Sequence, residues 1–157
     1  MKKLVVVVVM LSCIILLSFT KNPSGSFSVS KKAPDSLADE RDKIVRHLLD
    51  SLKGKESMPA DSIFSNLQLF TSSHRLKVSH LLAVMNYWGE ALGVKCNYCH
   101  SSGEWASDSF KTKRIAREMY NLRQTINAQI LKIPDIDPKL AQTNCTTCHN
   151  GSVLTRK

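Results

Sequence analysis

The chain has 157 residues and a formal net charge of +9, to which Lys2 and Lys3 contribute two charges. This length accommodates one domain and excludes two domains of ordinary size. Four of the five cysteines form two close pairs, within residues 96–99 and 145–148, and this short spacing argues against a scaffold of long-range disulfides.

Residues 1–20 have the layout of a secretory signal. Lys2 and Lys3 precede an unbroken run of apolar or small residues from Leu4 to Phe19, which is the order of regions in an exported precursor. A helix that crosses a bilayer needs about 20 apolar residues, so an uncleaved membrane anchor is the alternative. We therefore expect an exported protein, either periplasmic or attached to the membrane through its N-terminus and facing the periplasm.

Residues 21–34 predict a flexible linker. They read KNPSGSFSVSKKAP and are rich in Ser, Lys, Gly and Pro, a composition typical of tethers. The folded domain is therefore expected over residues 35–157.

Three segments of this domain have the apolar periodicity of amphipathic helices. We expect these helices at about residues 35–53, from residue 72 or 73 to just before Gly93, and from a cap at Ser109 to about residue 133. Residues 55–71 predict a turn or a short helix. No segment alternates convincingly as a strand, so the expected fold class is all-α, with about three main helices.

The third expected helix has the clearest apolar stripe, with spacings of four, three, four and four residues. The stripe consists of Ile115, Met119, Leu122, Ile126 and Ile130. The same segment also carries a basic cluster, formed by Lys111, Lys113, Arg114, Arg117 and Arg123. We interpret this cluster first as a solvated helix face and second as a docking surface for an acidic redox partner. Nucleic acid is not an expected partner of an exported protein.

The cysteine pairs belong to two Cys-x-x-Cys-His motifs, at residues 96–100 and 145–149. Two cysteines on one helical turn reach the two vinyl groups of a haem, and the histidine that follows them ligates the iron. The sequence therefore predicts two covalently bound haems c. The thioethers would come from Cys96, Cys99, Cys145 and Cys148, and the iron ligands would be His100 and His149.

Two other uses of the cysteines agree less well with the motifs. A zinc site of four cysteines has plausible ligand spacing, but it leaves His100 and His149 without a role. A thiol-redox pair is weaker still, because no βαβ pattern surrounds either motif.

The sequence pattern does not identify the second axial ligand of either iron, which would bind on the face opposite the motif histidine. Met85 and Met119 lie on apolar helix stripes, where core packing is slightly favoured over ligation. The histidine alternatives are His47, His74 and His80, which are each more typical of a surface position.

Several short stretches, inside and outside the two Cys-x-x-Cys-His motifs, match the sequence pattern of a known family. They are FSNL at 64–67, VMN at 84–86, LGVKCNYCH at 92–100, AREM at 116–119, IN at 126–127 and CTTCHNG at 145–151. Together they resemble the cytochrome c subunit of photosynthetic reaction centres. That subunit carries four haems in two homologous halves, and this chain resembles a single, stand-alone half with two haems.

The resemblance implies that Met85 is the sixth ligand of the first haem and that Met119 is the sixth ligand of the second. Because one haem of the four-haem protein takes a histidine from the other half, a histidine remains the alternative to Met119.

The implied function is electron transfer in the bacterial cell envelope, between redox partner proteins and without enzymatic activity. The alternative function is a haem enzyme or sensor with one open haem, such as a small-ligand reductase or a peroxidase-like protein.

Overall fold

The computed structural model describes residues 36–71 and 75–154. The expected signal or anchor at 1–20, the expected linker at 21–34 and the alternative ligand His74 lie outside the described residues. Among the residues that are described, no helix is both long enough and apolar enough to cross a bilayer.

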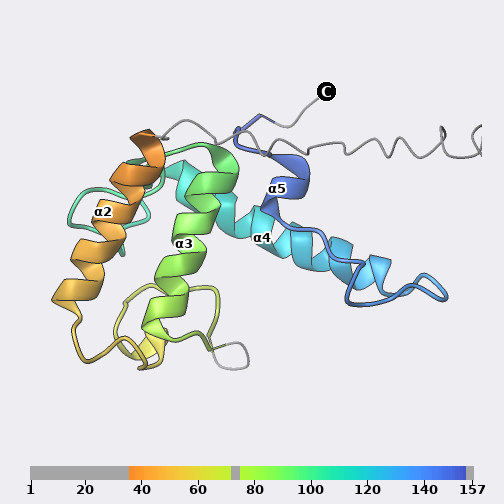
Figure 1. The fold of residues 1–157 in the computed structure, drawn as a ribbon, viewed down its shortest axis with the longest axis horizontal. Helices are drawn as coiled ribbons and strands as arrows, with labels where there is room; N and C mark the ends of the chain where they lie inside the picture. Colours follow the sequence, from red (N-terminus) through yellow and green to blue (C-terminus); the bar gives the residue numbers. More distant parts are fainter. Residues whose placement is uncertain (1–35, 72–74, 155–157) are drawn as a thin grey trace, which may run out of the picture. The chain divides into compact units, whose positions relative to one another are not determined.

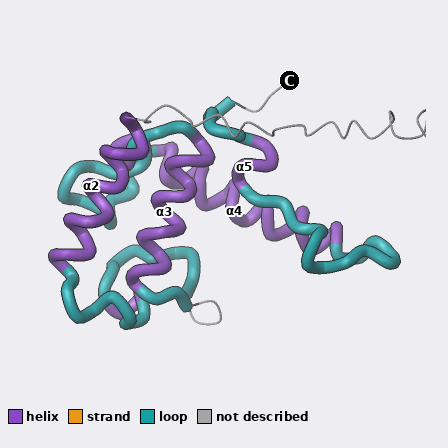
Figure 2. Tube along the Cα trace, viewed as in Figure 1, coloured by secondary structure: helices purple, strands orange, loops and turns teal. Residues whose placement is uncertain are grey.

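The described part of the chain is helical and contains no strand (Figure 2), which confirms the all-α expectation. The helices are α2 (Ser36–Ser51), α3 (Val78–Leu92), α4 (Lys111–Ile130) and the short α5 (Cys145–Cys148), with the 3-10 turns η2 (Ala60–Ser62) and η4 (Cys96–Tyr98). Helix α2 packs beside α3, and α3 also contacts α5 (Figure 1).

The second main helix begins at Val78, several residues later than its apolar pattern predicts. Lys77, directly before the helix, is extended and pairs with Pro59 in an isolated antiparallel bridge. The amide of Ala60 donates to the carbonyl of Leu76 at 2.8 Å, and the amide of Val78 donates to the carbonyl of Met58 at 3.0 Å. These long-range backbone hydrogen bonds remove the first predicted turn of the helix. Residues 55–71 form turns and the short η2, as expected.

Helix α3 ends at Gly93, which adopts the left-handed conformation with φ of 64°. The amide of Gly151 donates to the carbonyl of Ala91 at 2.8 Å. A Cβ on Gly93 would collide with the carbonyl oxygen of Gly151. Only glycine meets both conditions, the backbone angle and the close approach. The chain that follows the second Cys-x-x-Cys-His motif is thereby held against the helix that precedes the first.

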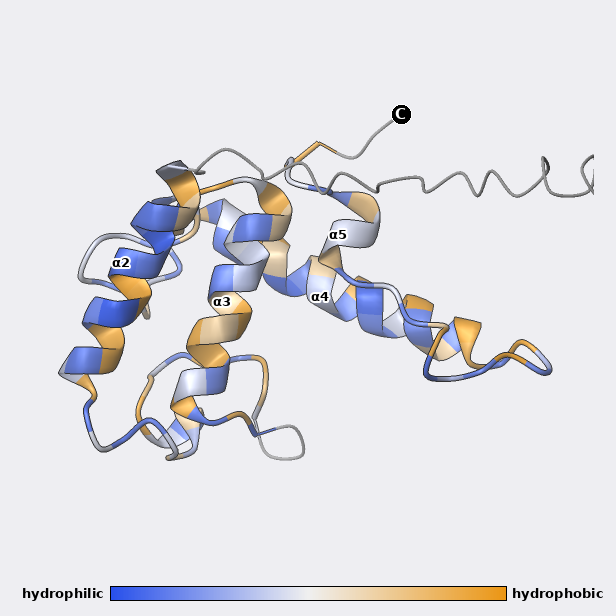
Figure 3. Cartoon of the chain, in the orientation of Figure 1, coloured by the Kyte–Doolittle hydropathy of each residue, from blue (hydrophilic) through white to orange (hydrophobic). Residues whose placement is uncertain are grey.

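The buried apolar core is small and is centred on α3. Among the described residues it consists of Ala60, Val78, Leu81, Leu82 and Ala91. The apolar stripe of α4 is not part of it, since Met119 is 41% exposed and Leu122 is 50% exposed. Figure 3 shows hydrophobic and hydrophilic residues alternating along α4. The expectation that this stripe packs in a protein core is therefore wrong for the polypeptide alone.

The face of α4 opposite the apolar stripe also differs from the expectation. Lys113 and Arg117 are only 9% exposed, although the basic cluster was expected to be a solvated face. That interpretation is wrong for these two residues, because their charged ends find partners in a loop rather than in water.

A residue with a Cβ in the left-handed conformation costs about 1–2 kcal/mol. Replacing Gly93 by Ala is expected to lower the free energy of unfolding by more than this. The excess arises from the collision with Gly151. Gly54→Ala is the matched control, because Gly54 has φ of 82° and nothing lies within 4 Å of an added Cβ. Denaturant unfolding of the purified protein measures both losses. Equal losses would show that the contact with Gly151 does not contribute.

Candidate functional site

The first Cys-x-x-Cys-His motif opens onto a cavity of about 440 Å³. Its lining comes from α2, residues 63–70, α3, residues 94–106 and the first turns of α4. Four of the residues singled out from the sequence line it together: Met85, Cys96, Cys99 and His100. Apolar side chains, among them Leu48, Phe64, Leu81 and Trp88, form most of the remaining wall. The volume and the apolar lining are those of a site for a large organic ligand.

A single turn brings the two thiols and the imidazole of the first motif together. The amides of Cys99 and His100 both donate to the carbonyl of Cys96, at 3.2 and 3.1 Å. The hydroxyl of Thr112 donates to the carbonyl of Tyr98 and ties this turn to α4. Burial raises the pKa of both the Cys96 and the Cys99 thiol. The thiols are therefore protonated near neutral pH.

His100 is held with one ring nitrogen free. Its Nδ1 lies 3.1 Å from the carbonyl oxygen of Trp105, and since a carbonyl only accepts, Nδ1 carries the proton. Burial lowers the pKa of His100, so the ring is neutral near pH 7. A neutral imidazole with its proton on Nδ1 presents the lone pair of Nε2, which is the form that binds a metal.

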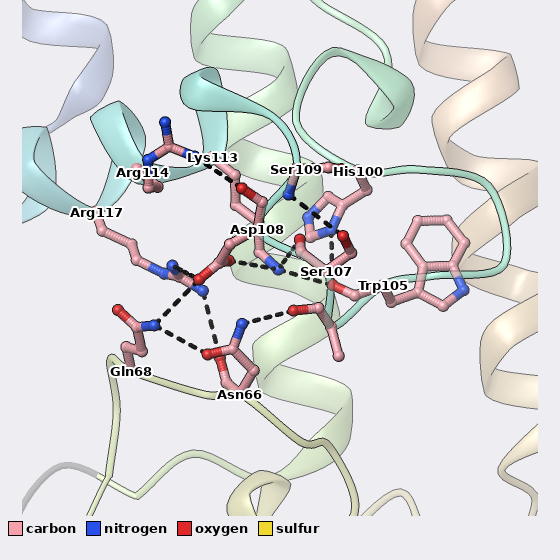
Figure 4. A network of polar contacts seen from close by, with 11 residues as sticks. Asn66, Gln68, His100, Trp105, Ser107, Asp108, Ser109, Lys113, Arg114 and Arg117 are labelled. Carbon is pink, nitrogen blue, oxygen red and sulfur yellow. Dashed lines mark hydrogen bonds and ion pairs between the residues drawn. The ribbon is translucent and has the colours of Figure 1, made fainter.

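A polar network fixes the loop that supplies this acceptor (Figure 4). Lys113 Nζ donates to the carbonyls of Trp105 and Ser107, each at 2.9 Å, and pairs with Asp108 at 3.3 Å. Arg117 Nη1 pairs with the other Asp108 oxygen at 2.9 Å. The carbonyl of Trp105 thus accepts from both His100 and Lys113, and the loop is anchored directly behind the imidazole.

Residues far away in the sequence complete the network. Asn66 Nδ2 donates to the carbonyl of Ala106 at 2.5 Å, and Gln68 Nε2 donates to Asp108 at 3.2 Å (Figure 4). Hydrogen bonds from Arg117 and then Asn66 hold the pKa of Asp108 well below its usual range. Asp108 therefore stays ionised and keeps both cations of α4 turned toward the loop.

The second motif repeats the local arrangement on α5. A capping box starts the helix: the amide of Thr147 donates to Asn144 Oδ1 at 3.1 Å, and the amide of Asn144 donates to Thr147 Oγ1 at 3.0 Å. His149 Nδ1 lies 3.2 Å from the carbonyl oxygen of Ser152, so Nε2 is again the free nitrogen. Burial raises the pKa of the Cys145 thiol.

The second motif lies outside the cavity, and so does Met119. The chain just before α5 is tied to α4, since Asn127 accepts from the amide of Thr143 at 2.8 Å and donates to its carbonyl at 3.1 Å. The guanidinium of Arg123 lies over the ring of Tyr120, 4.9 Å from its centroid. The chain that leads into the second motif is therefore held beside the second half of α4 through Thr143.

The zinc alternative is wrong. The described residues include all four motif cysteines, yet they contain no group of three or more His, Cys, Asp or Glu side chains that is placed to hold a metal ion. His47 and His80 are exposed and do not line the cavity.

Sequence reasoning missed the residues that orient His100. Lys113 and Arg117 were assigned to a solvated face, and Asp108 was not singled out. The available signal was the family resemblance: Arg117 lies within the AREM stretch at 116–119, and Asn66 lies within the FSNL stretch at 64–67.

The residues at the first motif fit a covalently attached haem. Two protonated thiols, an imidazole with a free Nε2 and a thioether sulfur all line one apolar cavity. This is the donor set of a haem with histidine and methionine as axial ligands.

Comparisons with known proteins agree with this chemistry. A sequence model described as photosynthetic reaction centre cytochrome C subunit matches residues 25–157. The chain is 39% identical over 70 residues to cytochrome c-554 of Chloroflexus aurantiacus, a match that covers 44% of this chain and 16% of that protein.

Two reaction-centre subunits are also similar. The photosynthetic reaction center cytochrome c subunit of Thermochromatium tepidum is 30% identical over 95 residues, which is 59% of this chain and 22% of that protein. The corresponding subunit of Roseobacter denitrificans is 27% identical over 130 residues, which is 81% of this chain and 33% of that protein.

The matches span only 16% to 33% of the length of these relatives, each of which is named as a cytochrome. No solved structure matches the chain significantly. The family match nevertheless extends from residue 25 to the last residue. Since it covers well over half of the sequence, the chain belongs to the photosynthetic reaction centre cytochrome c subunit family.

Proposed function

We propose that the protein is an electron-transfer cytochrome of the bacterial cell envelope with two covalently attached haems c. One observation carries the proposal: a single apolar cavity is lined by both thiols and the histidine of the first motif, together with Met85. The family match and the names of the relatives support it independently. A bound haem c supplies a reversible one-electron couple at its iron.

At the first motif, Cys96 and Cys99 would form the thioethers, and His100 would ligate the iron through Nε2. The hydrogen bond from Nδ1 to the carbonyl of Trp105 sets the ring orientation before any ligand binds. Met85 lines the same cavity and is the proposed second axial ligand. Histidine and methionine ligation suits electron transfer.

At the second motif, Cys145 and Cys148 would form the thioethers and His149 would ligate the iron. Met119 is the proposed second axial ligand, with a histidine as the alternative. Its support is the exposed apolar stripe of α4, in which Ile115 is 53% exposed and Leu122 is 50% exposed. Large contiguous apolar faces are rarely left in water, and the flat face of a macrocycle would cover this one.

The protein would exchange electrons with redox partner proteins, and residues 1–20 would direct it out of the cytoplasm or anchor it in the membrane. An electron carrier of this kind needs no substrate pocket other than its haem sites. If the second haem had an open face, the protein would instead be a small-ligand reductase or a sensor.

The number of haems is the first test. The mature protein is expected to show the reduced α band of a c-type cytochrome and a mass that exceeds the polypeptide by two haems under denaturing conditions. Cys145→Ser combined with Cys148→Ser is expected to remove one haem and to leave the other attached. A protein with no covalent haem, or with one haem that survives this double substitution unchanged, contradicts the proposal.

The methionine ligands are tested by substitution. Met85→Ala and Met119→Ala are each expected to abolish the weak absorption of oxidised methionine–iron ligation at one haem, and to let carbon monoxide bind that haem after reduction. The midpoint potential of the affected haem should fall, because loss of the thioether favours the oxidised iron. Met58→Ala is the matched control, since Met58 is an exposed loop residue that does not line the cavity.

The outcomes separate the two assignments. If Met85→Ala leaves the absorption and the carbon monoxide reactivity as in Met58→Ala, Met85 is not a ligand. If wild-type protein binds carbon monoxide at one haem, and Met119→Ala does not change this, the second haem has an open face. If neither wild type nor Met119→Ala binds carbon monoxide at the second haem, its second axial ligand is a residue other than Met119, as the histidine alternative requires.

A further inference from the structure

Arg41 is the most deeply buried charged side chain among the described residues, with 3% exposure. It comes from α2, which precedes the whole haem-binding part of the chain, and it lines the cavity of the first motif. Its Nη1 donates to the carbonyl of Val94 at 3.2 Å. Its Nε is buried and has no hydrogen-bond partner.

The carboxylates next to Arg41 on α2 are already engaged. Glu40 pairs with Lys95 at 2.6 Å, and Asp42 accepts from the side chain of Asn86 at 3.0 Å. No ion pair of Arg41 occurs within the ranges 36–71 and 75–154. A guanidinium stays charged at any physiological pH, and burying it without a counter-charge is strongly unfavourable. The described residues therefore place no anion beside Arg41 on the α2 side of the cavity.

The absence of a side chain at Gly89 leaves space for the side chain of Arg41. A Cβ on Gly89 would lie 2.7 Å from Arg41 Cδ and 3.5 Å from Arg41 Nε, so the side chain lies directly against the backbone of α3. Gly89 lines the cavity as well. Burial raises the pKa of the Cys96 thiol, and the charge of Arg41 opposes that increase, which agrees with a guanidinium close to the attachment site.

We propose that Arg41 forms a carboxylate-binding site at the α2 side of the cavity and that its ligand is a propionate of the haem attached at Cys96 and Cys99. The inference rests on the proposed function. The propionates are the anionic groups of a haem, and the planar fork of a guanidinium matches a carboxylate with two parallel hydrogen bonds. Arg41 is thus a positioning residue that locks α2 onto the first haem.

This ion pair has an electrochemical consequence. The buried positive charge of Arg41 favours the reduced iron, and it offsets the propionate charge, which favours the oxidised iron. Loss of Arg41 leaves the propionate charge uncompensated. The potential of the first haem should therefore fall when the guanidinium is removed, while that of the second haem changes little.

The test compares wild-type holoprotein with Arg41→Gln in a spectroscopic redox titration, with the first haem identified as the one whose potential responds to Met85→Ala. We expect an approximately tenfold shift of its oxidation equilibrium toward the oxidised form, which is about 59 mV for one electron. The propionate bending band in resonance Raman spectra should shift as well. Arg41→Lys should recover part of the potential, because it keeps the charge but loses the fork.

Arg46→Gln is the matched control, because Arg46 lies on the exposed side of the same helix. A first haem whose potential and propionate band are the same in Arg41→Gln and Arg46→Gln overturns the proposal. If Arg41→Gln does not mature, Arg41→Lys decides, and a propionate band identical to that of wild type contradicts the pairing. A wild-type protein without haem at the first motif would instead overturn the proposed function, before any variant is compared.

Discussion

The hydrogen bond from each motif histidine to a backbone carbonyl is the interaction on which the proposed chemistry depends. His100 donates to Trp105, and His149 donates to Ser152. In both cases the acceptor lies a few residues further along the chain, so the motif and its acceptor form one local unit. The bond fixes the tautomer and leaves Nε2 free, and without it a neutral imidazole would distribute its proton between two nitrogens.

The two units differ in how firmly the rest of the protein holds them. The carbonyl of Trp105, which accepts from His100, also accepts a hydrogen bond from Lys113. Asp108 forms ion pairs with both Lys113 and Arg117. The cost of burying two cations is offset here because a carboxylate and backbone carbonyls satisfy them. The unit of the second motif is held by the Asn127–Thr143 hydrogen bonds and by the backbone contact between Gly93 and Gly151. The first histidine therefore has a rigid support, whereas the second lies at the edge of the fold.

The motif residues, the three main helices and the family were predictable from the sequence, because each has a local signature: a spacing, an apolar period or a short matching stretch. The family match confirms the resemblance. The start of α3 was not predictable, since it depends on backbone pairing between Ala60 and Leu76. The buried cations were missed for a similar reason: periodicity assigns Lys113 to water, and only the folded loop brings Asp108 to it.

The exposed stripe of α4 shows why apolar periodicity and burial disagree in this chain. Periodicity reports that a helix face avoids water, but it does not say what covers the face. In α3 other parts of the polypeptide cover Leu81 and Leu82, whereas in α4 Ile115 and Leu122 remain half exposed. Within residues 36–71 and 75–154, the small core lies next to an apolar cavity and an uncovered stripe. This is what a polypeptide leaves when it is built around bulky apolar groups. On this reasoning the proposed haems complete the core as well as carry the electrons, so folding and cofactor attachment would be coupled.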